Sequence, residues 1–122
     1  MADDTNVHDE AEVRARLARD LPGWAAADDG IRRRYETSGW KATLMVVNAI
    51  GYLAEVAWHH PDIAASYGAV EVFLTSHDAG GVTDRDLALA RRIEDVVAWS
   101  PGDDDGPLTG APDSAVILKR DD

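Results

Sequence analysis

Apolar residues recur along this chain with two different periods, and each period predicts a different kind of element. Within residues 10–20, Val13 and Leu17 stand four positions apart, which is the spacing of one helical face, and Asp9 before them is a suitable N-cap. A proline and a glycine follow at 22–23 and end the run. We therefore expect the chain to open with an amphipathic helix.

Two short runs, Trp24–Ala27 and Ile31–Tyr35, come next and are separated by Asp28, Asp29 and Gly30. An Asp-Gly pair between two such runs is a strong hairpin signal, because both residue types tolerate the backbone of a tight turn. We expect two antiparallel strands here.

The longest apolar stretch predicts the main helix, from Gly39 or Trp40 to about Trp58. Ser38 is its expected N-cap, since a serine hydroxyl can accept from the free N–H groups of the first turn. Pro61 ends the helix, because the residue before a proline disfavours helical geometry. Apolar residues lie on most sides of this helix, so it should be mostly buried.

Strand character returns at Tyr67–Ser76, where Val70, Val72 and Leu74 point one way and their neighbours the other. A shorter strand is expected before it, at about Ile63–Ser66. With these two strands, the expected sheet has four strands.

The last helix is expected to start after Thr83 and to run to about Trp99. Asp86 stands three residues after Thr83, which is the spacing of a capping box. The apolar residues of its inner face recur at helical spacing: Leu87, Ala90, Ile93 and Val97. The order helix, two strands, helix, two strands, helix predicts an α+β fold, a two-layer sandwich with a four-stranded antiparallel sheet and about three helices on one face.

The composition changes at Ser100. Residues 1–99 carry all the expected elements and form one expected domain, whereas 100–122 are an acidic extension rich in Gly and Pro. Within this extension, Val116–Leu118 is a short apolar patch. It could add an edge strand to this chain or to a neighbour, or simply pack on the surface.

Charge and composition narrow the function. The chain has 122 residues, a formal net charge of −11 and no cysteine. Such a charge argues against nucleic acid as a partner, because that affinity comes from Lys and Arg neutralising phosphates. Without cysteine there are no disulfides and no thiolate metal sites. The acidic start does not resemble a signal peptide and no stretch is apolar enough for a membrane span, so we expect a cytoplasmic protein with no membrane partner.

Three of the four histidines fall at the ends of expected elements. His59 and His60 follow the main helix, and His77 follows the long strand, just before a Gly-Gly turn. Imidazole has an unperturbed pKa of about 6.5, so grouped histidines indicate proton transfer or metal binding. Glu55 is four residues before His59 and is expected to share its helical face, where its carboxylate would fix the tautomer of that imidazole.

Simpler interpretations of these residues stay open. A histidine at a helix end can merely favour the negative end of the dipole. The capping box alone explains Asp86, and an aromatic such as Trp24 is more often a core residue than a ligand contact. A metal site of His59, His77 and Glu55 is not excluded, but the spacing matches no known zinc signature such as His-Glu-x-x-His.

Taken together, these spacings resemble those of the pterin-4a-carbinolamine dehydratases, a family also known as dimerization cofactors of a homeodomain transcription factor. The family pattern is an acidic residue, three spacers, His-His-Pro, an aromatic residue, a later histidine and a later aspartate. This chain supplies the whole pattern: Glu55, His59, His60, Pro61, Tyr67, His77 and Asp86. The resemblance covers about residues 10–99 and includes the tryptophan at 24.

The resemblance implies an activity, which is dehydration of 4a-hydroxytetrahydropterin to quinonoid dihydropterin in tetrahydropterin recycling. The pterin is then the substrate, and neither a metal nor another cofactor is expected. The implied catalytic residues are His59, His60, His77 and Glu55, with His59 and His77 as the acid/base pair. The implied substrate-binding residues are Trp24, His60 and Asp86. A homodimer or homotetramer is also implied.

A second function is compatible with the same resemblance. Some members of this family would act without catalysis, as protein-binding factors in transcription or in Rubisco assembly. Retention of all three histidines favours the enzyme, because a binding role alone has no need of them.

Overall fold

A computed structural model describes residues 6–104, 106–110 and 116–118 of the chain. The helices and strands follow the expected order: α1 (Glu10–Asp20), β1 (Trp24–Ala27), β2 (Gly30–Glu36), α2 (Trp40–Ala57), β3 (Asp62–Ser66), β4 (Ala69–Leu74) and α3 (Asp84–Val97). The first helix and the first strand have the predicted bounds. The strand predicted at 67–76 is two residues shorter at each end, and the last helix ends two residues earlier than predicted.

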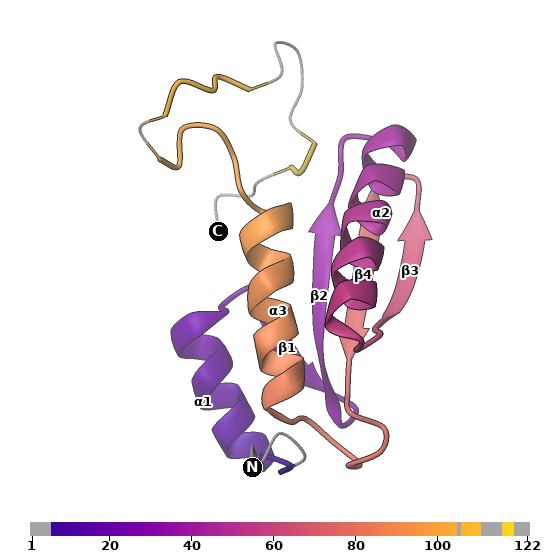
Figure 1. Cartoon of the computed structure of the whole chain (residues 1–122), viewed down its shortest axis with the longest axis vertical. Coiled ribbons are helices and arrows are strands. Elements are labelled where there is room, and N and C mark those ends of the chain that lie inside the picture. Colours follow the sequence, from indigo (N-terminus) through magenta and orange to yellow (C-terminus); the bar gives the residue numbers. More distant parts are fainter. Residues whose placement is uncertain (1–5, 105, 111–115, 119–122) are drawn as a thin grey trace.

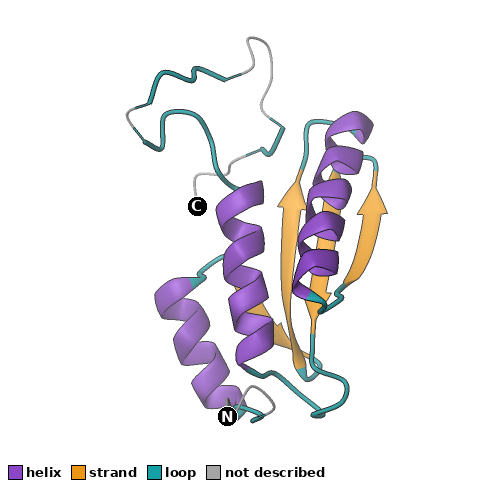
Figure 2. Cartoon of the chain, viewed as in Figure 1, coloured by secondary structure: helices purple, strands orange, loops and turns teal. Residues whose placement is uncertain are grey.

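The four strands form one antiparallel sheet in the order β1-β2-β4-β3. Figure 1 shows α2 and α3 lying over one face of this sheet, with α1 beside α3 and next to β1. The same view coloured by element type shows the strands behind the helices (Figure 2). For the part of the chain that the structure describes, the predicted α+β fold with a four-stranded antiparallel sheet and three helices is confirmed.

The core lies between the sheet and the helices. Val70, Val72 and Leu74 of β4 are fully buried, as their alternation predicted. On the opposite face of the sheet, the guanidinium of Arg34 bonds to Glu71 at 2.9 Å. The three consecutive arginines at 32–34 therefore alternate between the two faces of β2. Arg32 and Arg34 are exposed and form part of a solvated sheet surface.

The β1–β2 hairpin forms where the sequence predicted it, but the glycine has another role. The two turn residues are Asp28 and Asp29, with φ angles of 50° and 63°, which is the left-handed backbone of a type I′ turn. Gly30 is the first residue of β2, and a Cβ there would clash with the Phe73 ring and the Leu74 carbonyl oxygen. The glycine is needed for close approach of two strands.

The main helix has the predicted bounds to within one residue, but its N-cap differs from the prediction. Its N-cap is Gly39, which has no side chain to make a capping bond, so Ser38 does not cap it. At the other end, Trp58 adopts a left-handed conformation with φ 54° and ψ 49°, which costs a non-glycine residue about 1–2 kcal/mol. The helix therefore ends ahead of Pro61, and the two histidines that follow lie outside it.

The apolar patch Val116–Leu118 pairs with the end of β2. Its two ends make backbone hydrogen bonds of 3.1 and 2.8 Å with Ser38 and Glu36, and Ile117 packs against the core. Since β1 pairs only with residues 30–33 of β2, the patch fills the edge that β1 leaves open. Of the possibilities that the sequence left, pairing with the sheet of the same chain is the one observed, as an isolated β-bridge between Thr37 and Ile117.

Glu94 on α3 connects the helix layer to the sheet. Its carboxylate accepts four hydrogen bonds: from Trp24 Nε1 (3.0 Å), Arg33 Nε and Nη2 (3.0 Å each) and Tyr35 Oη (2.7 Å). Burial pushes the pKa of Glu94 up, but the hydrogen bonds from Arg33 and Tyr35 outweigh it and hold the pKa below its ordinary value. This network stabilises the fold most when the carboxylate is ionised.

We expect the Glu94→Gln variant to be less stable than the wild type by about 2 kcal/mol at pH 7, because the Arg33 guanidinium loses its counter-charge. A carboxylate whose pKa is lowered on folding contributes stability above its unfolded-state pKa and loses it as pH falls through the folded-state pKa. The stability difference should therefore shrink as pH falls below about 4.5. Urea denaturation at pH 7 and pH 3 checks this, and an equal difference at both pH values would contradict it.

Candidate active site

Asp86, in the first turn of α3, is fully buried and makes contacts in two directions. Its Oδ2 accepts from the Thr83 backbone N–H and from the Ser76 hydroxyl, both at 2.8 Å. The Thr83 side chain caps the helix in return, so the predicted capping box is confirmed. Capping uses only one carboxylate oxygen, and Oδ1 is left for a partner outside the helix.

That partner is His59. Its Nε2 lies 2.6 Å from Asp86 Oδ1, and its side chain is only 11% exposed. Because an ionised carboxylate can only accept, Nε2 carries a proton and Nδ1 is the nitrogen left to exchange a proton with another molecule. A short, charge-assisted bond in buried surroundings fixes the orientation and the tautomer of the ring. The Asp86 carboxylate thus fixes the tautomer of His59, a role that the sequence spacing assigns to Glu55.

The acidic residue of α2 pairs with the second histidine instead. Glu55 Oε1 lies 3.0 Å from His60 Nε2, so the expected contact of Glu55 with His59 is wrong. The four-residue spacing misleads because Trp58, in its left-handed conformation, breaks the helix before His59. Both partners are exposed, and an exposed ion pair is worth at most about 1 kcal/mol, so His60 is held less firmly than His59.

His77 is an exposed residue of a tight turn. The backbone N–H groups of residues 79–81 donate to the Ser76 carbonyl oxygen. The turn is fastened to α3 at two points, because the Ser76 hydroxyl reaches the buried carboxylate of the capping box and Asp78 bonds to Arg85 at 3.1 Å. Within the described residues the His77 side chain makes no hydrogen bond or ion pair, so its ring is available to a ligand.

The structure therefore fastens two of the predicted residues to one carboxylate. His59 bonds to Asp86 directly, and the turn that carries His77 bonds to it through Ser76. His59 is partly buried and held in a single tautomer, whereas His77 is exposed and has no side-chain partner among the described residues. Two imidazoles held at the same helix end can donate and accept a proton in one reaction.

Trp24 is not with these histidines. It is 3% exposed in the core, and its indole N–H bonds to Glu94, eight residues and so about 12 Å along α3 from Asp86. The expectation that its ring stacks on a pterin therefore has no geometric support in this chain. The aromatic residue beside the site is Trp58, which is 73% exposed and packs edge-on against His60 with ring centroids 4.9 Å apart.

Sequence reasoning missed three residues that build this site: Trp58, Ser76 and Arg85. Each is the immediate neighbour of a residue of the family pattern, so adjacency was the only signal available. Among the residues that the structure describes, no three His, Asp or Glu side chains are grouped so that they could hold a metal ion. The metal site considered from the sequence finds no support, since Glu55 is bonded to His60.

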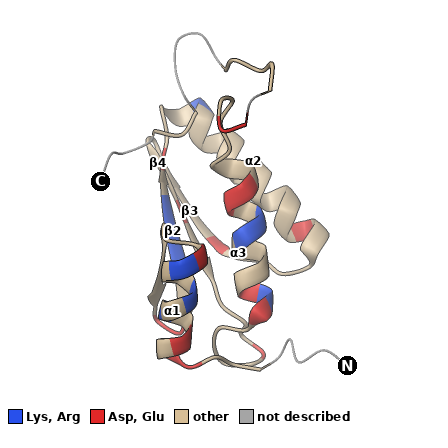
Figure 3. Cartoon of the chain, turned by 90° about the vertical axis from the view of Figure 1, so that its left-hand side faces the viewer, with Lys and Arg blue, Asp and Glu red and all other residues tan. Residues whose placement is uncertain are grey.

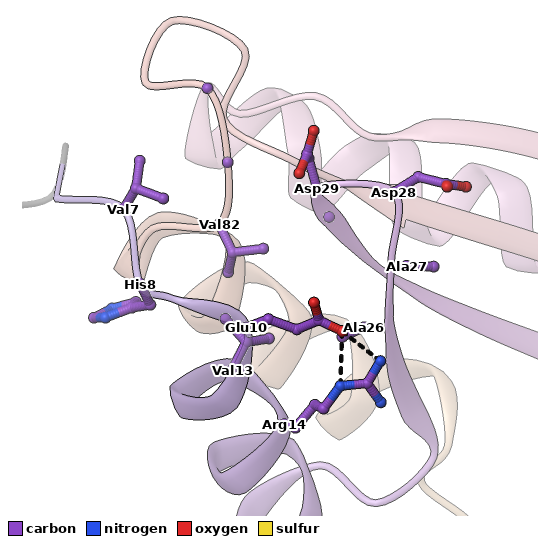
Figure 4. A pocket seen from close by; sticks show the side chains of 13 residues that line it. Val7, His8, Glu10, Val13, Arg14, Ala26, Ala27, Asp28, Asp29 and Val82 are labelled. Carbon is purple, nitrogen blue, oxygen red and sulfur yellow. Dashed lines mark hydrogen bonds and ion pairs between the residues drawn. The ribbon is translucent and has the colours of Figure 1, made fainter.

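A separate cavity of about 340 Å³ lies between the N-terminal segment, α1 and the β1–β2 turn. Figure 4 shows Asp28 and Asp29 on one wall and Glu10 bonded to Arg14 on another. Residues 80–81 of the tight turn also line it, but none of the three site histidines does. The three site histidines and Asp86 therefore lie outside the lining of this cavity.

The family model described as "Pterin 4 alpha carbinolamine dehydratase" matches residues 6–96 of the chain, a range that contains every residue of the pattern. This chain belongs to the pterin-4a-carbinolamine dehydratase family. The resemblance drawn from the spacing of the histidines is thereby confirmed. The hydrogen-bonded pair His59–Asp86 lies within the matched region.

Two bacterial relatives carry the dehydratase name as a provisional assignment. The protein from Aquifex aeolicus (strain VF5) is 48% identical over 88 residues, which are 72% of this chain and 88% of the relative. The protein from Thermomicrobium roseum is 40% identical over 90 residues, 74% of this chain and 96% of the relative. The extension from residue 100 onward is therefore largely outside the shared region.

Solved structures show the same family fold. A transcriptional coactivator/pterin dehydratase from Brucella melitensis aligns with a TM-score of 0.69 and 28% identity, over 77% of this chain and all of that one. A pterin dehydratase-like protein described as a RuBisCO assembly factor shares the fold at a TM-score of 0.54 and 20% identity, over 64% of this chain and 93% of that one. Of the helices described in this dehydratase-family chain, none has the length and apolar character to cross a bilayer.

Proposed function

We propose that this protein is a dehydratase that converts 4a-hydroxytetrahydropterin to quinonoid dihydropterin. The observation that carries the proposal is the 2.6 Å bond from His59 to the buried Asp86, with the exposed His77 on a turn fastened to the same carboxylate. This is the acid–base pair that a dehydration needs, in a chain of the matching family. The same reaction would recycle tetrahydropterin in the cytoplasm.

Each step of the reaction has a residue suited to it. Hydroxide is a poor leaving group, so an imidazolium donates a proton to the departing 4a oxygen, which leaves as water. The lone pair of the neighbouring ring nitrogen expels it, and the second imidazole takes the proton that this nitrogen then loses. His59 acts through Nδ1, because Asp86 occupies Nε2. No atom changes oxidation state, so the proposal requires no metal and no redox cofactor.

His60 is proposed to orient the substrate. Its Nε2 is bonded to Glu55, and its ring is contacted by Trp58, so it offers Nδ1 beside an exposed aromatic face. A flat pterin ring can stack on such a face, and stacking adds to the area that is buried. Asp86 would then serve the substrate through His59, because its own oxygens are fully used within the protein.

NMR titration with a stable 7,8-dihydropterin tests where a pterin binds. We expect the side-chain signals of His59, His60 and His77 to shift in one saturable titration, because all three border the proposed site. The signal of His8, which is bonded to Asp84 outside the site, should not move. Shifts confined to His8, or no saturable shift at any histidine, would contradict the proposal.

We also propose that the chain forms a homodimer or homotetramer through α2. Three large apolar residues of this helix are 42–70% exposed at four- or eight-residue spacing: Trp40, Leu44 and Tyr52. These exposed apolar residues share one side of α2, interrupted by Asn48, and such a surface indicates a contact face.

Tyr52→Glu should lower the mass of the assembly, because a buried charge without a partner is costly in an apolar contact. Sedimentation velocity measures this. Ala18→Glu, which adds the same charge to an exposed position of α1, is the matched control and should leave the mass unchanged. Equal masses for the Tyr52 variant and the control would remove α2 from the contact.

A further inference from the structure

A groove of about 370 Å³ leads away from His59 between α2 and α3. Its walls are apolar, with Leu53 and Val56 on α2 and Leu89 on α3. Two arginines and no carboxylate complete the lining: Arg85 and Arg92. Although the chain has a formal net charge of −11, the charged side chains that line this groove are both arginines.

Arg92 makes no ion pair or hydrogen bond within the part of the chain that the structure describes. Of the arginines that the structure describes, the other eight each make an ion pair with an Asp or Glu, and Arg92 makes none. An unpaired guanidinium on the rim of an apolar groove is a ready donor for an anionic ligand, because its planar donors match carboxylate and phosphate oxygens.

Arg85 also has donors to spare. Only its Nη2 is bonded to Asp78, at 3.1 Å, while its Nε is buried without any partner in the described chain. It stands in the first turn of α3, where the helix dipole disfavours a cation. The bond to Asp78 uses one donor of the guanidinium, and the remaining donors are available to a ligand.

The two guanidiniums are arranged along the groove. Residues 85 and 92 are seven apart, which is two helical turns and places them on one face of α3, about 10 Å apart along its axis. Figure 3 shows two basic segments on α3, each with an acidic segment close beside it. Arg85 is near the histidine end, since His59 bonds to Asp86, and Arg92 is farther along the groove.

We propose that this groove holds an anionic side chain of the pterin substrate, ending in a phosphate or a carboxylate, with Arg92 as its main partner. The inference rests on the proposed function, because it places the pterin ring at the histidines. The apolar walls contact the carbon chain of the substituent, and the guanidiniums bond its charged end. A neutral hydroxylated side chain would leave Arg92 without a counter-charge from the ligand or from the described residues.

The test compares binding of three unreactive 7,8-dihydropterins that differ only in the side chain: neutral dihydroxypropyl, the same chain as a phosphate monoester, and a glutamate-terminated chain. Fluorescence titration of the full chain gives each Kd without turnover. We expect at least one anionic compound to bind about tenfold more tightly than the neutral one. The tighter of the two anionic compounds identifies the source, phosphate or carboxylate.

Arg92→Gln should reduce this preference to less than about threefold, and Arg92→Lys should restore part of it. Arg19→Gln removes the same charge from an exposed position of α1 and should leave the preference unchanged. The preference should also fall with added salt.

Equal Kd values for all three compounds, or a preference unaffected by Arg92→Gln, would overturn the inference. The dehydration proposal can fail separately, because the rate and the binding preference are independent measurements. A folded protein that does not speed the reaction can still bind the anionic compounds more tightly. If none of the three compounds binds, the pterin site and the inference both fall.

Discussion

Replacing His77 with alanine should lower kcat/KM for dehydration of 4a-hydroxytetrahydropterin by about 10²–10⁴-fold, the usual contribution of one general acid or base. The melting temperature should not change, because the side chain is exposed and bonds to nothing else in the described chain. This combination of a large kinetic effect and no structural effect distinguishes a catalytic residue from a turn residue. Stopped-flow absorbance and thermal unfolding of the same sample measure both quantities.

His8→Gln is the matched control, since it removes a histidine outside the site. His8 bonds to Asp84 at 2.8 Å and lines the separate cavity. Its substitution should leave the rate of dehydration unchanged. Full turnover by the His77→Ala variant would show that His77 is not the acid or base, and the chemistry would then have to be reassigned.

Asp86→Ala should have the largest effect on stability, lowering the free energy of unfolding by about 4 kcal/mol. The variant loses its side of the capping box and leaves the Ser76 hydroxyl and the His59 ring without their acceptor in buried surroundings. Activity should fall with it, because the ring of His59 is no longer fixed. Urea denaturation measures the first effect and the dehydration rate the second.

Asp86→Asn separates the two roles of this residue. An amide keeps the shape and can still accept at one oxygen, so the cap should survive with a cost of about 1 kcal/mol. The amide nitrogen can only donate to His59, which would force the ring into the other tautomer, and the rate should still fall by at least about tenfold. Asp84→Asn alters the neighbouring exposed carboxylate as a control and should change neither quantity by much. A fully active Asp86→Asn variant would mean that Asp86 only caps the helix.

The sequence predicted the layout of the fold well, because most elements are set by local patterns. Val13 and Leu17 define one face of α1, and Thr83 with Asp86 defines the start of α3. The errors occur where contacts distant in sequence decide. Gly30 is fixed by the approach of Phe73 from another strand, and no local turn rule contains that information.

The sequence predicts which residues form the site more accurately than it predicts their contacts. His59 and Glu55 were paired by helical spacing, yet one left-handed residue, Trp58, redirects His59 toward α3. The sequence leaves two roles open for Asp86, helix cap and site residue. One carboxylate oxygen caps the helix and the other bonds to His59, so the two roles are compatible. The resemblance implies that Trp24 binds the pterin, whereas its hydrogen bond to Glu94, 70 positions away in the sequence, holds it in the core.

The rate of water loss from freshly generated 4a-hydroxytetrahydropterin, followed by stopped-flow absorbance with and without the protein, tests the central claim most directly. The account predicts a rate that rises in proportion to protein concentration, with many turnovers per chain, well above the spontaneous rate. A folded sample that leaves the spontaneous rate unchanged would contradict it and would favour a family member that acts by binding another protein.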